Sequence, residues 1–443
     1  MPTSPAQTTI YQRPAELLQQ LIRFNTTNPP GNELACITYI NTLLKEAGFQ
    51  TTILASDPAR PNLITCLRGS GNAPPLLLQG HVDVVTTEKQ NWQQPPFAAN
   101  EIDGYIWGRG ALDMKGGVAM MIAALRRAKA ENISLPGDVV LTVLSDEEAG
   151  SRLGAQFLVE QHPELFKDIR YAIGEFGGFS LHFGGKKFYA IQVLEKQICW
   201  LKATVRGPGG HASIPMHGGA AAKLGHVLQQ LDKHRLPLHS TPILQQMIET
   251  MAVVIPAPLG SQMLQLLDPT QTQLVLNALG AQKSLIEPLL YNTANVTIIR
   301  GGSKINVIPS EIIFEIDGRL LPGFSPQDML DELHQLIGTD VELEVVRYDQ
   351  GQAEPNMGFY DTLARILHEA DPDSTPIPVL TPAVTDGRFF SRLGIQTYGF
   401  IPMTLPEDFN FLQTVHAADE RIPVEAMEFG TQAIYKALQR NKA

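Results

Sequence analysis

Apolar residues recur along the chain with two different spacings, and each spacing predicts a type of secondary structure. A helical period indicates amphipathic helices, and short continuous apolar runs bounded by turn residues indicate buried strands. The predicted helices cover residues 13–22, 35–44, 116–129, 218–231, 326–337, 361–370 and 424–438. The predicted strands cover residues 51–54, 63–67, 76–78, 139–144, 171–173, 201–205, 296–299, 312–316 and 341–346.

Three of the buried strands in the first half of the chain end in polar residues. His81 and Asp83 follow the first, an acidic run at 146–148 follows the second, and Glu175 follows the third. Strands that alternate with helices predict an α/β sheet covered on both faces. Ligands bind at the carboxyl ends of the strands in such sheets. We therefore expect these side chains to gather at one edge.

The pattern changes after about Glu195, where strands and helices no longer alternate in the same way. This change predicts a smaller α+β domain at residues 198–351, inserted into an α/β domain formed by residues 1–197 and 352–443. The stretch between 239 and 288 is rich in Pro, Gln and Leu, and the pattern assigns no element to it.

Composition narrows the possible classes of protein. The 443 residues are 44% hydrophobic and 18% charged, with a net charge of -11. This is ordinary globular composition. The chain lacks both an apolar run long enough to cross a membrane and a basic cluster for nucleic acid, so neither partner is expected. The N-terminus does not resemble a signal peptide, and we expect a cytoplasmic protein. The three cysteines are too few and too far apart to predict a disulfide framework.

Histidine and acidic residues at these strand ends could ligate metal. Each has an ordinary structural explanation when considered alone: a polar strand end for His81 and Glu175, a helix N-cap for Asp113, and a surface position for His416. Together they form a nitrogen and oxygen ligand set without cysteine. Such a set suits zinc, with manganese or cobalt as alternatives. Two ions that share one carboxylate would activate a bridging water.

Three segments carry a resemblance to a known family. Residues 80–85, 108–116 and 146–150 resemble the signatures of the co-catalytic zinc metallopeptidase and amidohydrolase family of acetylornithine deacetylase, succinyl-diaminopimelate desuccinylase, aminoacylase and carboxypeptidase S. The resemblance spans nearly the whole chain. It implies a doubly wound, mixed-sheet catalytic domain with an inserted lid that forms a homodimer, and hydrolysis of an N-acyl amino acid or short peptide by a metal-bridging hydroxide.

The resemblance also implies a role for each residue of these motifs. His81 and Glu175 would bind one divalent ion, Glu148 and His416 the other, and Asp113 would bridge them. Glu147 would be the general base, which the residue pattern alone does not distinguish from Glu148. Asp83 would orient the first histidine or its surroundings. The family commonly has a cis peptide after the bridging aspartate, here Asp113–Met114.

Further candidates lie in the lid and in a late loop. His211, in the segment 207–213, resembles the family's lid histidine, which reaches the partner's active site. Asn306 and Arg319 resemble lid residues that contact substrate, and Arg388 resembles a substrate-loop residue. Arg319 could instead form an ion pair with Asp317 or Glu315.

Other functions remain open on the sequence. A catalytically silent binding member of the same fold would usually have lost a ligand or the base, and none is missing here. A ureido or ester hydrolase could use the same metal site. Ala383 and Val384 precede Thr385 where desuccinylases have a glycine-rich stretch, which argues against a succinyl-diamino acid substrate.

Overall fold

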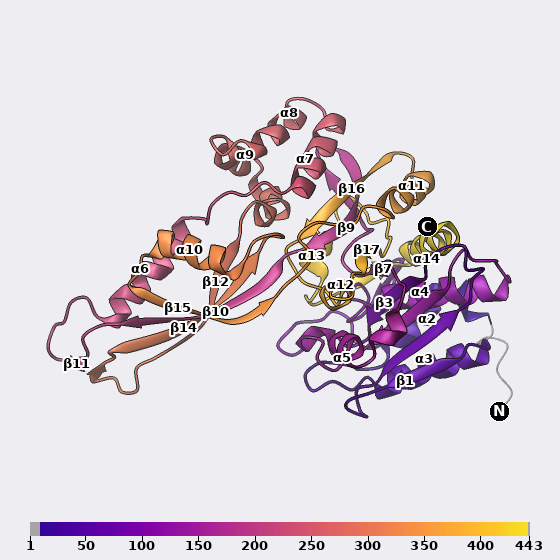
Figure 1. Ribbon diagram of the computed structural model, residues 1–443, viewed down its shortest axis with the longest axis horizontal. Helices are drawn as coiled ribbons and strands as arrows, with labels where there is room; N and C mark the ends of the chain where they lie inside the picture. Colours follow the sequence, from indigo (N-terminus) through magenta and orange to yellow (C-terminus); the bar gives the residue numbers. More distant parts are fainter. Residues whose placement is uncertain (1–8, 442–443) are drawn as a thin grey trace. The chain divides into compact units, whose positions relative to one another are not determined.

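The computed structural model describes residues 9–441. The chain divides into two compact units (Figure 1). Unit 1 comprises the residues up to Val193, Asn356–Val379 and the chain from Thr385, and unit 2 comprises Leu194–Pro355 with Leu380–Val384. The boundaries expected from the sequence were 198 and 351, and the return of 380–384 to unit 2 was not expected.

Within the described residues, unit 1 is built around a mixed sheet of nine strands in the order β1-β2-β6-β3-β7-β17-β9-β16, with β8 paired to β9. Strands β3, β6, β7 and β17 include parallel pairs, and β1 and β2 are antiparallel. The strands are β1 (Thr51–Leu54), β2 (Asn62–Leu67), β3 (Leu76–His81), β6 (Val139–Leu144), β7 (Tyr171–Gly174), β8 (Ser180–Phe183), β9 (Lys186–Glu195), β16 (Ser374–Thr381) and β17 (Gln396–Gly399). The α/β class expected from the sequence is confirmed.

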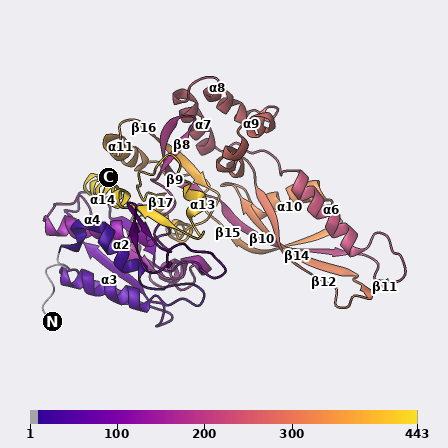
Figure 2. The ribbon, with the colours of Figure 1, turned by 180° about the vertical axis from the view of Figure 1, so that it is seen from behind.

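Helices bury both faces of this sheet, which explains why its central strands are continuous apolar runs. Helix α4 packs against β3 and β6. Helices α2, α4 and α14 contact one another and lie side by side in Figures 1 and 2. Helices α5 and α12 lie on the opposite face, where Leu77 and Phe389 belong to one apolar cluster. The helices are α2 (Pro14–Ile22), α3 (Leu34–Glu46), α4 (Lys115–Ala130), α5 (Ala155–Gln161), α11 (Tyr360–Ala370), α12 (Gly387–Ser391), α13 (Phe411–Thr414) and α14 (Val424–Arg440).

Two local features bring the start of α4 and the C-terminal loops close to β3. A Cβ on Gly80 would come within 2.6 Å of Met114 Cε, so glycine permits the close approach of α4 to β3. A small sheet in the order β18-β5-β4 joins Arg421–Pro423 to Tyr105–Trp107 and Glu101–Ile102. The loops before α4 and before α14 are thereby tied together.

Unit 2 contains a four-stranded antiparallel sheet in the order β12-β14-β10-β15. Its strands are β10 (Gln197–Arg206), β12 (Thr293–Gly301), β14 (Glu311–Leu320) and β15 (Val341–Asp349). Helices α6 (Ala220–Lys233) and α10 (Pro326–Ile337) share one apolar core with the sheet, which includes Leu224, Phe314 and Leu333. A two-residue ladder pairs β11 (Gly210–His211) with β13 (Val307–Ile308).

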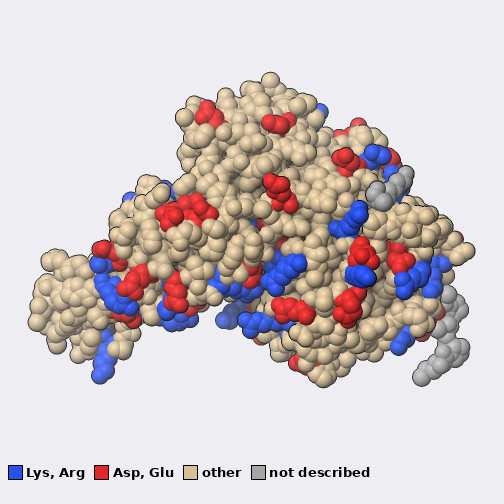
Figure 3. Space-filling view, viewed as in Figure 1, with Lys and Arg blue, Asp and Glu red and all other residues tan. Residues whose placement is uncertain are grey.

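The stretch to which the sequence pattern assigned no element is helical. It forms α7 (Pro242–Val254), α8 (Leu259–Leu264) and α9 (Thr272–Ala278), with one 3-10 turn between α8 and α9 and two more after α9. Thr241 caps α7 by accepting a hydrogen bond from Leu244 N. Figure 3 shows few charged side chains over these helices, whereas acidic and basic side chains are interspersed elsewhere on that face. Among the described residues, no helix is long and apolar enough to cross a membrane.

Candidate metal centre

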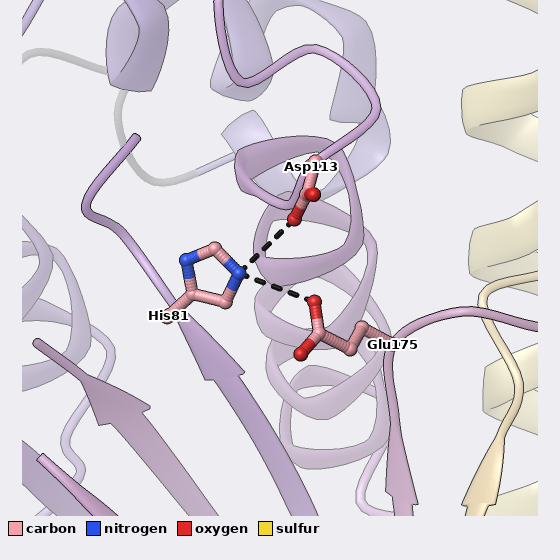
Figure 4. A group of neighbouring side chains, drawn as sticks. All are labelled: His81, Asp113 and Glu175. Carbon is pink, nitrogen blue, oxygen red and sulfur yellow. Dashed lines mark hydrogen bonds and ion pairs between the residues drawn. The ribbon is translucent and has the colours of Figure 1, made fainter. Parts of the chain in front are cut away.

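The first group of candidate ligands forms where two parallel strands end. Strands β3 and β7 pair in parallel, so His81 at the end of β3 and Glu175 directly after β7 lie at the same sheet edge. Asp113 reaches them from the loop before α4. His81 Nε2 lies 3.1 Å from Asp113 Oδ1 and 3.2 Å from Glu175 Oε2 (Figure 4). All three side chains are buried.

The second group uses the other oxygen of Asp113. His416 Nε2 lies 3.1 Å from Asp113 Oδ2 and 3.3 Å from Glu148 Oε1. Asp113 therefore presents one carboxylate oxygen to each histidine, and ligand atoms of each group lie within 4.8 Å of one another. Side-chain exposure is 1% for His81 and 48% for His416, so the second group is the more open one.

The hydrogen bonding of His81 tests whether a cation fits. Its Nδ1 donates to the backbone carbonyl of Asp83 at 3.0 Å, which in a neutral ring leaves the lone pair on Nε2. That lone pair faces carboxylate oxygens of Asp113 and Glu175, an arrangement that a proton or a metal ion must stabilise. A second ring nitrogen held by a carbonyl is typical of metal-ligating histidines.

The carboxylates show the same need for positive charge. Burial raises the pKa of Glu175 to about 8 although His81 opposes the shift. Burial, and then Asp113, raises the pKa of Glu148. Glu148 Oε1 is buried and has no hydrogen-bond partner among the described residues, its ion-pair contact being His416 at 3.3 Å. These donors fit two divalent cations that share Asp113.

The histidines respond in the opposite direction. Burial alone would lower the pKa of His416, but its close contacts with the carboxylates of Asp113 and Glu148 outweigh this effect and raise the pKa to about 10. Burial would likewise lower the pKa of His81, but Glu175 and Asp113 raise it well above its usual range. Both shifts have the same cause, because the surrounding carboxylates favour positive charge at the imidazoles, and a bound metal ion would supply such charge.

The acidic run after β6 separates its two glutamates. Glu148 joins the second ligand group, whereas Glu147 points elsewhere, with Oε1 3.8 Å from Arg388 Nη1. Burial, and then the charge of Glu175, raises the pKa of Glu147 well above its usual range. The structure therefore distinguishes two residues that the sequence pattern left equivalent.

Asp83 fixes this run through its carboxylate. Its Oδ1 accepts a hydrogen bond from Glu147 N and its Oδ2 one from Glu148 N, each at 3.1 Å. Asn28 Nδ2 donates to Oδ2 at 2.8 Å. The carboxylate lies 3.5 Å from His81 Nδ1, farther than the backbone carbonyl that holds the ring. Asp83 thus contacts the first histidine by its backbone and the glutamates by its side chain.

Sequence reasoning missed a buried network that supports the same run. Asp146 has a left-handed backbone with φ 70° and accepts hydrogen bonds from Asn28 at 3.2 Å and Arg60 at 2.9 Å. Arg60 also binds Glu33, which is fully buried. Asn28 directly precedes two prolines, a sequence that by itself indicates only the end of a helix. Its role was hidden because its partners lie 55 and 118 residues away.

The remaining sequence candidates do not join these groups by any described contact. His211 and Asn306 are exposed in unit 2, where Ala212 N donates to Asn306 O at 3.2 Å. Arg319 pairs with both oxygens of Asp317, at 2.7 and 3.1 Å, which is one of the ion pairs considered from the sequence. Arg388 is buried in unit 1 and donates to Thr385 O at 2.6 Å.

The peptide between Asp113 and Met114 is cis, as the resemblance implied. The sequence model of the peptidase family M20/M25/M40 matches residues 77–440. The chain belongs to this family. The match spans both ligand groups and unit 2, and membership makes the chain a metal-dependent hydrolase.

Relatives of this family cover most of the chain. Human aminoacylase-1 is 27% identical over 405 residues, which is 87% of this chain and 86% of the relative. The N-fatty-acyl-amino acid synthase/hydrolase of Xenopus tropicalis is 27% identical over 383 residues, covering 84% of this chain and 73% of the relative. An M20 metallo-carboxypeptidase from Sulfolobus solfataricus shares the fold, with a TM-score of 0.67, 16% identity and coverage of 96% and 98%.

Proposed function

We propose that this M20/M25/M40 protein hydrolyses the amide bond of N-acyl amino acids or short peptides with two divalent ions bound. The observation that carries the proposal is the position of Asp113 between the two ligand groups. Its Oδ1 faces the group that contains His81, and its Oδ2 faces the group that contains His416. The substrate class follows from the relatives, which include an aminoacylase and an N-fatty-acyl-amino acid hydrolase.

The proposed ligands are His81 and Glu175 for one ion, Glu148 and His416 for the other, and Asp113 for both. When bound, the two ions supply a Lewis acid for the scissile carbonyl and lower the pKa of water. We propose zinc as the metal, with cobalt or manganese as alternatives, because the ligands are imidazoles and carboxylates without a thiolate.

Glu147 is the proposed general base. It is adjacent to a ligand but belongs to neither ligand group, so its carboxylate is available to the attacking water. A raised pKa favours a carboxyl that accepts a proton on one oxygen and then delivers it to the leaving nitrogen. Arg388, at 3.8 Å, supports the ionised form before the proton arrives. Asp83 holds the backbone of the base in position.

Unit 2 has proposed roles that depend on a second subunit. His211 is the proposed donor to the carbonyl oxygen as negative charge develops there, supplied by the partner subunit of a homodimer. Asn306 and Arg319 of unit 2, together with Arg388 of unit 1, are proposed contacts for the substrate, with an arginine binding its carboxylate. A cytoplasmic location is part of the same proposal.

The direct test is a substrate panel. Protein stripped of metal and reconstituted with Zn²⁺, Co²⁺ or Mn²⁺ is assayed against N-acyl amino acids, dipeptides, ureido acids and esters. We expect cleavage of acyl amino acids or dipeptides above the ureido and ester substrates. Hydrolysis restricted to ureido acids or esters would refute the proposed bond specificity, and no hydrolysis with both ions bound would refute the proposed activity.

A further inference from the structure

A buried ion pair joins the two loops that carry Asp113 and His416. Arg109 Nη1 lies 2.6 Å from Glu420 Oε2, and both residues are fully buried. Two buried charges are costly to maintain, and removing one partner leaves the other uncompensated. Arg109 lies in the loop before α4, and Glu420 lies between His416 and β18 (Arg421–Pro423). The pair therefore connects segments that are 311 residues apart in sequence.

Each member of the pair also binds the backbone of the opposite loop. Glu420 Oε1 accepts hydrogen bonds from Leu112 N at 2.8 Å and Asp113 N at 3.2 Å. Arg109 Nη2 donates to His416 O at 3.1 Å. Glu420, in the loop of His416, thus holds the backbone of Asp113. Arg109, in the loop of Asp113, holds the backbone of His416.

A third side chain completes this arrangement. Gln90 Oε1 accepts a hydrogen bond from Arg109 Nη2 at 2.8 Å, and Gln90 Nε2 donates to His416 O at 2.9 Å. The carbonyl of His416 therefore receives hydrogen bonds from two side chains. We call Arg109, Glu420 and Gln90 the loop clamp.

The histidine that this clamp holds needs such support more than His81 does. His81 ends a buried strand and its ring is fixed by the carbonyl of Asp83. His416 lies in a loop with φ 62°, a backbone conformation that is costly for a residue other than glycine. Its side chain is 48% exposed, so packing contributes less to its position.

We propose that the buried pair Arg109–Glu420 is a positioning device that sets the affinity of the second metal position, formed by Asp113, Glu148 and His416. The first position, formed by His81, Asp113 and Glu175, depends on it less because His81 is held by β3. This inference rests on the proposed function, since it requires two metal positions. Neither Arg109 nor Glu420 contacts substrate in this account.

Glu420→Gln isolates the ion pair. The glutamine oxygen can still accept from Leu112 N and Asp113 N. The amide NH2 of the glutamine would face the guanidinium of Arg109, so that two hydrogen-bond donors would oppose each other. The double variant Arg109→Met with Glu420→Gln leaves no buried charge in the clamp, so it provides a second protein if the single variant does not fold. Asp371→Asn is the matched control, because Asp371 forms a part-buried ion pair with Lys187 at 2.8 Å outside both ligand groups.

The experiment titrates chelator-stripped full-length protein with Co²⁺ and follows heat and visible absorption. Wild type and Asp371→Asn should bind two equivalents. In both clamp variants the second equivalent should bind about 10- to 100-fold more weakly, the usual effect of outer partners on a metal site, with the first changed little. Arg109→Met alone is measured as well. The loss of affinity for the second equivalent in the double variant should not exceed the sum of the losses in Arg109→Met and Glu420→Gln, because the two residues act as a unit.

Three outcomes would refute the proposed role of the loop clamp. The second equivalent could bind the clamp variants as tightly as wild type, both equivalents could weaken equally, or Asp371→Asn could show the same selective loss. A wild-type chain that binds fewer than two equivalents would instead contradict the proposed function itself. The two failures are therefore distinguishable in one set of titrations.

Discussion

Asp83→Asn tests how the backbone of the acidic run is held. The carboxylate accepts from Asn28 Nδ2 and Glu148 N on Oδ2 and from Glu147 N on Oδ1. Asparagine has a single acceptor oxygen. If that oxygen replaces Oδ2 it keeps two donors, and its amide group then faces Glu147 N. In the reverse orientation the amide group of the new asparagine would face two donors, Asn28 Nδ2 and Glu148 N. The amide of Asn28 cannot flip to accept instead without losing its hydrogen bond to Asp146 at 3.2 Å.

The magnitude follows from these contacts. A hydrogen bond to a charged acceptor contributes about 1.5–3 kcal/mol, and a buried N–H left without a partner costs about 1–3 kcal/mol. Asp83 is fully buried, so solvent does not compensate. We expect a loss of about 2–5 kcal/mol in the free energy of unfolding. Because the released amide belongs to Glu147, turnover should fall about 10²-fold, the scale of general-base loss, with metal still bound.

The assay combines urea unfolding, metal analysis and turnover on the best substrate of the panel. Asp138→Asn is the control, because Asp138 also accepts from a backbone amide, Gly69 N at 2.8 Å, but lies outside both ligand groups and is partly exposed. It should cost less than about 1 kcal/mol and leave turnover unchanged. Wild-type stability and turnover in Asp83→Asn would refute the argument, as would a loss of metal as its main effect.

Three further predictions address other parts of the chain. Burial lowers the pKa of Lys196 to about 7, and the charge of Arg319 adds to the shift. Between about pH 7 and 10.5 the unfolded chain therefore binds more protons than the folded chain, so the free energy of unfolding rises with pH across that window. Lys196→Met should abolish this rise, which is about 5 kcal/mol at most, and a slope that persists in pH-dependent unfolding would contradict the assignment. Converting the substrate carboxylate to an amide should remove most activity if Arg319 or Arg388 binds it, and equal rates for the two forms would exclude both. Mixed dimers of inactive Glu147→Gln and His211→Ala chains should regain activity, whereas no rescue after confirmed subunit exchange would show that His211 does not act across subunits.

The apolar pattern predicted the central sheet because the strands are buried on both faces. The apolar run at 76–78 begins the strand that ends at His81, and Glu175 follows a second strand of this kind. The first ligand group could therefore be expected at one sheet edge. Helices α7–α9 were not predicted, because the stretch has few charged residues and includes exposed apolar ones, with Val253 85% and Leu274 67% exposed. The contrast between apolar and polar faces on which the helical pattern depends is therefore weak there.

The contacts that position the ligands were beyond the reach of the sequence pattern. Asp83 meets the amides of Glu147 and Glu148 from 64 and 65 residues away, and Arg109 meets Glu420 across 311 residues. No local spacing encodes such pairs, since they depend on how loops approach one another after the sheet has formed. Side-chain contacts distinguished Glu147, which lies near Arg388, from Glu148, which lies near His416, although the two neighbours are chemically identical.

The assignment of metal ligands and base is tested most directly by measuring bound metal and turnover together in Glu147→Gln and Glu148→Gln. Glu147→Gln should retain two divalent ions per chain and lose at least about 10²-fold in turnover, because it removes the proton acceptor and no ligand. Glu148→Gln should lose metal from the position it shares with Asp113 and His416. Loss of metal from Glu147→Gln with full retention in Glu148→Gln would contradict the account.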